Sequence, residues 1–135
     1  MRNELAGDAA PCVAVIDDDP ATRSLMHEIL LEGGYVVVLW DGLEDPFTLL
    51  KRAQPDVMIL DIRLGPGLTI WSVLDELDQL PARLRPQTLV CSADTLFLRK
   101  HGDTLRDQSC GIVEKPFDID VLLSAVESCL EPSRR

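Results

Sequence analysis

Residues 15–20 read VIDDDP, in which two β-branched residues run directly into three aspartates and a proline. The stretch ends a continuous apolar run, CVAVI at 12–16, of the kind found in a strand that is covered on both faces of a sheet. Asp19 is a predicted helix N-cap, and Pro20 is a predicted first residue of that helix. These residues therefore predict a buried strand, an acidic turn and the start of a helix.

The same alternation continues along the chain. The first helix has apolar pairs at Leu25/Ile29 and Met26/Leu30 and is expected to end at Gly33-Gly34. Further strands are expected at 35–40, 56–60, 88–91 and 110–114, and further helices around 47–53, 70–77, 95–106 and 118–130. Alternating strands and helices imply parallel crossovers with helices on both faces of one sheet. The expected fold is α/β: a flavodoxin-like, doubly wound, five-stranded parallel sheet of order 2-1-3-4-5 with five helices.

Length and charge limit the function further. A chain of 135 residues is the size of one domain, and we expect a flexible leader at 1–10, the domain at 11–131 and a short tail at 132–135. The formal net charge of −10 argues against direct binding of nucleic acid, which needs Lys and Arg to neutralise phosphates. There is no apolar run long enough for a membrane span and no secretory signal, so we expect a cytoplasmic protein.

Polar residues stand where four of the expected strands end. Asp17, Asp18 and Asp19 follow the first strand, Asp61 the third, Ser92 the fourth and Lys115 the fifth. In the order 2-1-3-4-5 these four strands are neighbours, so their carboxyl ends form one cluster. Clustered carboxylates need a counter-charge, and Mg²⁺ is a cation that a few carboxylates bind well. A carboxylate beside Mg²⁺ can accept a phosphoryl group, with a lysine and a hydroxyl to contact its oxygens.

Four stretches make the resemblance to a known family specific. VAVIDDDPATRSLM, DVMILDIRLGPG, LVCSAD and VEKPFD, in this order, resemble the receiver domain of bacterial two-component response regulators over nearly the whole chain. The resemblance implies that Asp61 is the phosphoacceptor. It implies that Mg²⁺ is held by Asp17, Asp18, Asp61 and the backbone carbonyl of Arg63. The domain would be a signalling module with its own phosphorylation and dephosphorylation chemistry rather than an enzyme.

The resemblance also implies roles for the remaining residues and for partners. Ser92 is the hydroxyl that moves to the phosphoryl group, and Lys115, expected to precede a cis peptide bond to Pro116, pairs with its oxygens. Asp19 is more consistent with a helix cap than with a metal ligand. The phosphoryl donor would be a sensor histidine kinase or a histidine phosphotransfer protein, and the output a protein target. The family also allows a homodimer through the face formed by the fourth helix, fifth strand and fifth helix.

The sequence departs from the family pattern at two places, and two further residues occupy positions that vary within the family. Gly65, Pro66 and Gly67 displace the usual proline of the loop after Asp61, and Ile112 replaces the aromatic residue three positions before the lysine. We therefore hypothesise that phosphorylation shifts the fourth helix or fifth strand without rotation of an aromatic side chain. Arg63 and Asp94 follow the phosphoacceptor and the hydroxyl by two residues, and we expect them to pair over the site and slow hydrolysis.

Two other functions remain open at this level. A phosphatase of the haloacid dehalogenase type also uses a Mg²⁺-bound aspartate, and the D-x-D of Asp17 and Asp19 and the stretch GDTLRD at 102–107 fit it superficially. The threonine expected two residues after Asp19 is replaced by Ala21, and that function leaves Asp61 and Lys115 without a role. The other alternative is a receiver-like interaction domain that is never phosphorylated.

Overall fold

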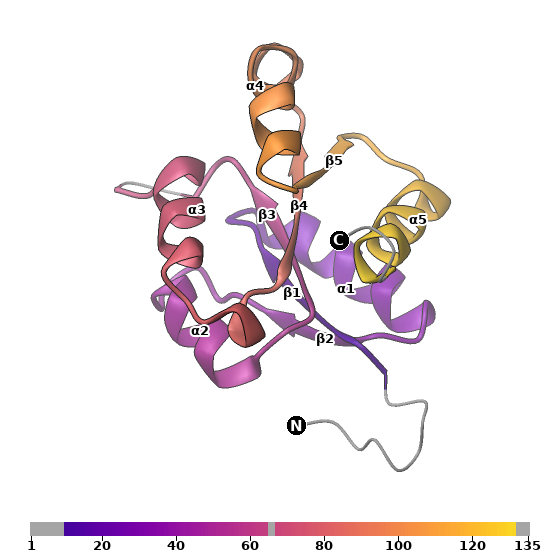
Figure 1. Cartoon of the computed structure of the whole chain (residues 1–135). Coiled ribbons are helices and arrows are strands. Elements are labelled where there is room, and N and C mark those ends of the chain that lie inside the picture. The colour runs from indigo at the N-terminus through magenta and orange to yellow at the C-terminus, as the bar shows by residue number, and fades with distance from the viewer. Residues whose placement is uncertain (1–9, 65–66, 132–135) are drawn as a thin grey trace.

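The computed structural model describes residues 10–64 and 67–131 (Figure 1). Apart from Ala10, the predicted leader and the predicted tail lie outside the described residues, as do Gly65 and Pro66 of the loop after Asp61. In the described part of the chain no helix has both the length and the apolar character needed to cross a membrane.

Strands and helices alternate along the whole chain. The strands are β1 (Cys12–Ile16), β2 (Val36–Leu39), β3 (Val57–Asp61), β4 (Gln87–Ser92) and β5 (Gly111–Glu114). The α-helices are α1 (Pro20–Glu32), α2 (Pro46–Ala53), α3 (Ile70–Asp78), α4 (Thr95–Asp107) and α5 (Ile119–Leu130). A short 3-10 turn at Ala82–Leu84, which the sequence analysis did not predict, precedes β4.

The five strands form one parallel sheet in the order β2-β1-β3-β4-β5, which confirms the predicted flavodoxin-like fold. Every residue of β1 and β3 is buried, because these central strands are covered on both faces. β2 lies at an edge and is only partly buried. The register pairs Asp61 with Cys91 and Ser92 with Glu114, so the ends of β3, β4 and β5 lie at one edge of the sheet.

The helices cover the two faces of the sheet unequally (Figure 1). One core cluster joins the sheet to α2, α3 and α4, with buried side chains such as Leu49, Val73 and Leu105. The other joins it to α1 and α5, where Leu30 and Leu122 are fully buried. The sheet therefore has three helices on one face and two on the other, and its central strands β1 and β3 are fully buried.

Local side-chain contacts fix where the helices begin. The Asp19 carboxylate accepts a hydrogen bond from the Ala21 N–H and caps α1, as predicted. Thr69 and Ser72 form a reciprocal capping box at the start of α3, which positions this helix after the unusual loop. Asp94 caps α4 by accepting from the Phe97 N–H at 2.9 Å.

The predicted apolar stripe of α1 was wrong at one position. Met26, Ile29 and Leu30 are buried, whereas Leu25 is 52% exposed. Successive helical residues are separated by about 100°, so Leu25 lies well to one side of the face centred on the three buried residues. Pairing by i, i+4 spacing alone could not show which of two adjacent pairs faces the sheet.

This difference predicts unequal costs for two neighbouring substitutions. Met26→Ala should lower the free energy of unfolding by about 2–5 kcal/mol, because it leaves a cavity between α1 and the sheet. Leu25→Ala should change it by less than about 0.5 kcal/mol, because an exposed side chain loses little packing. Urea unfolding of both variants checks this, and equal costs would contradict the burial assigned to α1.

Candidate phosphoacceptor site

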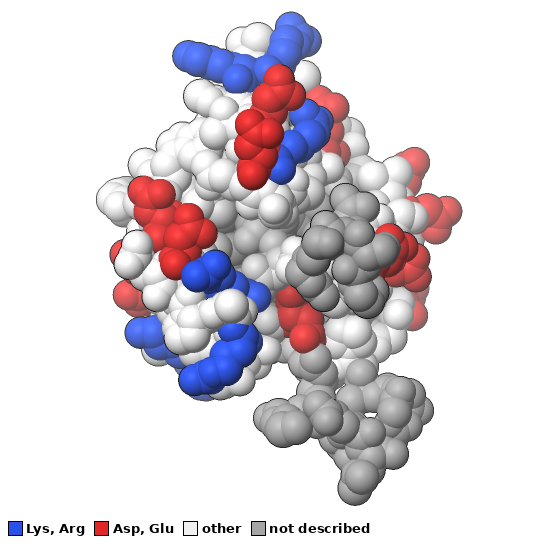
Figure 2. Space-filling model, in the orientation of Figure 1, with Lys and Arg blue, Asp and Glu red and all other residues white. Residues whose placement is uncertain are grey.

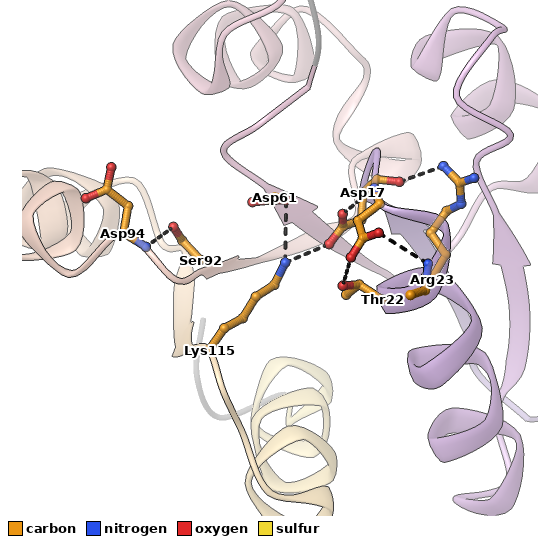
Figure 3. Close-up of polar contacts among 9 residues, drawn as sticks. Asp17, Thr22, Arg23, Asp61, Ser92, Asp94 and Lys115 are labelled. Carbon is orange, nitrogen blue, oxygen red and sulfur yellow. Dashed lines mark hydrogen bonds and ion pairs between the residues drawn. The ribbon is translucent and has the colours of Figure 1, made fainter.

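The predicted site residues lie together at the carboxyl edge of the sheet (Figure 3). Asp17 directly follows β1, Asp61 ends β3, Ser92 ends β4 and Lys115 directly follows β5. The side chains of Asp17, Asp61 and Ser92 are almost inaccessible, with exposed fractions of 1%, 6% and 1% for the residues. The parallel topology brings these side chains together, because all strands have their carboxyl ends at the same edge of the sheet.

Asp17 is held by three hydrogen bonds. Its Oδ1 accepts from the Asp19 N–H at 2.9 Å, and its Oδ2 accepts from the Lys115 Nζ at 2.9 Å. Its backbone carbonyl accepts from the Arg23 Nη1 at 2.8 Å. Both carboxylate oxygens and the carbonyl oxygen are thus engaged, so the first turn after β1 has a fixed geometry.

Lys115 lies between two of the carboxylates. Its Nζ is 2.9 Å from Asp17 Oδ2 and 3.5 Å from Asp61 Oδ2, and its side chain is only 18% exposed. The peptide bond from Lys115 to Pro116 is cis, as predicted. The Lys115 backbone N–H donates to the Ser92 carbonyl at 2.8 Å, which joins the ends of β4 and β5.

The acidic residues form a group suited to a divalent cation. Carboxylate oxygens of Asp17, Asp18 and Asp61 all lie within 4.8 Å of one another, and Asp18 is exposed while the other two are buried. Hard oxygen ligands of this kind fit Mg²⁺, which binds few carboxylates and retains several waters. Asp19 is outside this group and binds instead to Ala21 and Thr22 of α1.

Ser92 is in place, but its hydroxyl faces away from the acidic group. Its Oγ accepts a hydrogen bond from the Asp94 N–H at 2.9 Å, on the side opposite Lys115 (Figure 3). The predicted pairing of Arg63 with Asp94 was wrong for this structure: no ion pair joins these two described side chains. The Asp94 carboxylate caps α4 instead, because an N-cap satisfies a helix N–H that would otherwise lack a partner.

Comparison with known proteins decides the family. The profile of the response regulator receiver domain matches residues 13–127. This chain is a receiver domain. The chain is 30% identical, over 94% of its length, to the C4-dicarboxylate transport transcriptional regulatory protein DctD of Pseudomonas aeruginosa, but it spans only 27% of that protein. It is 27% identical to an uncharacterized 14.6 kDa protein of Leptolyngbya boryana, with 87% of this chain and 89% of that protein covered.

Solved structures agree with this assignment. The receiver domain of a response regulator from Bermanella marisrubri has a TM-score of 0.76 and 25% identity, with 90% of this chain and 99% of that chain covered. The chemotaxis response regulator CheY4 of Vibrio cholerae shares the fold, with a TM-score of 0.74 and 22% identity over 90% of this chain and 99% of that one. This receiver domain is therefore a phosphoacceptor signalling domain of a two-component system.

The phosphatase alternative does not fit this fold. The stretch GDTLRD at 102–107 lies inside α4 rather than after a strand, so its aspartates are not at the carboxyl edge of the sheet. Asp103 forms an exposed ion pair with Arg106, one helical turn away. The D-x-D similarity of Asp17 and Asp19 is also superficial, because Asp19 serves as a helix cap.

Arg23 is a site residue that the sequence analysis did not identify. It lies in the first turns of α1, where the helix dipole disfavours a cation, and this is the one signal that marked it as unusual. Its contact with the Asp17 carbonyl offsets that cost and ties α1 to the end of β1. Backbone hydrogen bonds from Glu44 and Leu43 are the main causes that lower the pKa of Asp41, and the charge of Arg23 makes a smaller contribution in the same direction.

Charge crowding shifts the pKa of the central groups. Burial raises the pKa of Asp61, the charge of Asp17 raises it further, and the charge of Lys115 only partly offsets these effects. Burial alone would lower the pKa of Lys115, but the Asp17 hydrogen bond and the charges of Asp61 and Asp17 outweigh it and raise that pKa. The Lys115 ammonium therefore stays charged, whereas ionisation of Asp61 in the folded domain costs free energy.

This cost predicts that Asp61→Asn stabilises the metal-free domain. At pH 7 the free energy of unfolding should rise by about 0.5–2 kcal/mol, because the variant removes a carboxylate whose charged form is disfavoured by burial and by the charge of Asp17. A raised pKa in the folded state favours the protonated acid, so the difference should shrink as the pH falls through that pKa. Urea unfolding in a chelator from pH 7 to pH 4 measures it.

Asp75→Asn is the matched control, since Asp75 is exposed on α3 and does not belong to the acidic group of Asp17, Asp18 and Asp61. It should leave the unfolding free energy within about 0.5 kcal/mol of the wild type. If Asp61→Asn destabilised the domain at pH 7, the carboxylate repulsion assigned to the site would be contradicted.

Proposed function

We propose that Asp61 accepts a phosphoryl group in a Mg²⁺-dependent reaction, and that the donor is a sensor histidine kinase or a histidine phosphotransfer protein. The observation that supports this most strongly is the lysine ammonium 2.9 Å from Asp17 and 3.5 Å from Asp61 at the sheet edge. A structural ion pair would need only one of these carboxylates. Two buried acids around one lysine leave an excess of negative charge that suits a bound cation.

The chemistry follows from the positions of the groups. An Asp61 carboxylate oxygen attacks the phosphorus of a phosphohistidine, the phosphorus–nitrogen bond breaks, and its electron pair returns to the imidazole, which takes up a proton from water. Lys115 is placed to contact the phosphoryl oxygens as negative charge spreads over them. Ser92 ends the neighbouring strand β4, and its hydroxyl, which now faces Asp94, would have to turn to donate to the phosphoryl group.

The metal ligands in this proposal are the carboxylates of Asp17, Asp18 and Asp61 and the backbone carbonyl of Arg63. When bound, Mg²⁺ supplies positive charge that offsets the carboxylates and the phosphoryl oxygens. In this structure Lys115 Nζ donates a hydrogen bond to Asp17 Oδ2. We infer that this contact holds the Asp17 carboxylate in the orientation that Mg²⁺ needs. The Lys115 ammonium and Mg²⁺ would then compete for the same carboxylate.

Charge and exposed apolar side chains support the proposed partners. On the face shown in Figure 2, Lys and Arg side chains lie in separate groups with Asp and Glu beside them, and the net charge is −10, so we propose no direct contact with nucleic acid. The output is a protein target or a homodimer through α4, β5 and α5. Leu96 on α4 and Ile119 and Val121 on α5 are 73%, 55% and 48% exposed, which supports contacts there. A cytoplasmic location stays a prediction.

Incubation with acetyl phosphate tests the phosphoacceptor. With Mg²⁺ the wild type should gain the mass of one phosphoryl group in an adduct that hydroxylamine removes, and chelation of Mg²⁺ should abolish the gain. Asp61→Asn should gain nothing, whereas Asp75→Asn should react like the wild type. Intact-protein mass spectrometry measures the mass gain of the wild type with Mg²⁺, the wild type with a chelator, and the two variants.

The alternatives give different results when the wild type is also incubated with Mg²⁺ and a phosphoester in a parallel sample. Turnover of a phosphoester with no stable adduct would support a phosphatase. Neither an adduct nor turnover would support an interaction domain that is not phosphorylated, and either outcome would overturn the proposal.

A further inference from the structure

Three aromatic side chains form a cluster between α3 and α4. The rings of Trp71 on α3 and His101 on α4 are 5.2 Å apart in an edge-on arrangement, and Phe97 on α4 lies 4.6 Å from His101 and 6.0 Å from Trp71. All three are partly buried. Ring pairs at these distances attract one another, so this aromatic cluster joins the two helices beside the site.

A short series of contacts links this cluster to Ser92. The Ser92 Oγ accepts from the Asp94 N–H at 2.9 Å, and the Asp94 Oδ1 accepts from the Phe97 N–H, also at 2.9 Å. Ser92 is 1% exposed, so water does not readily replace the first of these contacts, whereas the second is exposed to solvent. The Ser92 hydroxyl is therefore connected to Phe97 through Asp94 alone.

A phosphoryl group on Asp61 would compete for this hydroxyl. It brings three strong acceptor oxygens to the side of the site where Lys115 lies, whereas the Ser92 hydroxyl now faces Asp94 (Figure 3). Side-chain torsions occupy discrete staggered positions, so the hydroxyl cannot reach both sides at once. If it turns toward the phosphoryl group, the Asp94 N–H at the start of α4 loses its acceptor.

The position usually held by a coupling aromatic residue contains Ile112. It is partly buried against the same core cluster as Leu98 of α4, and as a β-branched residue it has little torsional freedom. Phe97 and His101, by contrast, stand on the helix whose cap depends on Ser92 and Asp94. The aromatic groups placed to respond at this edge are therefore those between α3 and α4.

We propose that Asp94 is a positioning residue that couples the Ser92 hydroxyl to the aromatic cluster, so that phosphorylation repacks Trp71 against Phe97 and His101. This inference rests on the proposed phosphoacceptor role of Asp61. It places the surface that changes on phosphorylation at α3 and the start of α4, next to the exposed Leu96, in addition to the face formed by α4, β5 and α5.

Tryptophan fluorescence tests this directly. The chain has two tryptophans, so Trp40→Phe leaves Trp71 as the only emitter, and Trp40 is buried in the core near α2 rather than in the cluster. The emission maximum and the acrylamide quenching constant are measured before and after acetyl phosphate with Mg²⁺, and mass spectrometry gives the fraction of adduct in each sample. We expect both fluorescence values to shift in proportion to the adduct.

Matched variants in this background separate coupling from general loosening. Ser92→Ala and Asp94→Ala should reduce the shift per adduct, while Ser92→Thr, which keeps a hydroxyl, and Asp94→Asn, which keeps a cap acceptor, should restore most of it. Circular dichroism confirms that each variant is folded. Comparison at equal adduct fraction removes any effect of a variant on the phosphorylation reaction itself.

Three results would overturn the inference. An unchanged Trp71 signal in the Trp40→Phe protein with a confirmed adduct would show that the cluster does not respond. An equal shift per adduct in Ser92→Ala and Asp94→Ala would show that the contacts through Asp94 do not carry the response. Failure to form any adduct would overturn the phosphoacceptor role itself and this inference with it, and the mass measurement distinguishes that case from the other two.

Discussion

The ammonium of Lys115 between Asp17 and Asp61 is the interaction on which the site depends. Two buried carboxylates at one sheet edge repel each other strongly where water is excluded, and the lysine offsets only part of that repulsion. Burial raises the pKa of Asp61, and the repulsion by Asp17 that the lysine leaves uncompensated raises it further. The domain thus keeps an electrostatic strain at its centre that a divalent cation or a phosphorylation reaction can relieve, and such strain is common at functional sites.

The fold supports this arrangement by burying the two central strands that carry the acids. β1 and β3 are covered on both faces, so their backbone is fixed by hydrogen bonds to neighbouring strands and their side chains pack in two separate cores. Asp17 directly follows β1, and Asp61 is the last residue of β3. A rigid sheet therefore holds both acids, while the capped helices α1, α3 and α4 surround them and can respond to change.

Much of this could be predicted from the sequence, because the informative patterns are local. Continuous apolar runs predicted the central strands. The polar residues at the strand ends, Asp17, Asp61, Ser92 and Lys115, were then predicted to be neighbours. Details that depend on side-chain direction could not be obtained this way. The burial of Met26 rather than Leu25, the hydrogen bond from Lys115 to Asp17, and the capping role of Asp94 all depend on contacts between elements that sequence spacing does not specify.

The central claim is that Asp61 is the group that carries the phosphoryl. Borohydride reduces an acyl phosphate at the side chain that holds it, and peptide mass spectrometry of the reduced protein then identifies the residue. After reaction with acetyl phosphate and Mg²⁺, the account predicts reduction at Asp61, with Asp17 and Asp18 unchanged. Reduction at Asp17, Asp18 or another acid, or no reduction in a sample with a confirmed adduct, would contradict it.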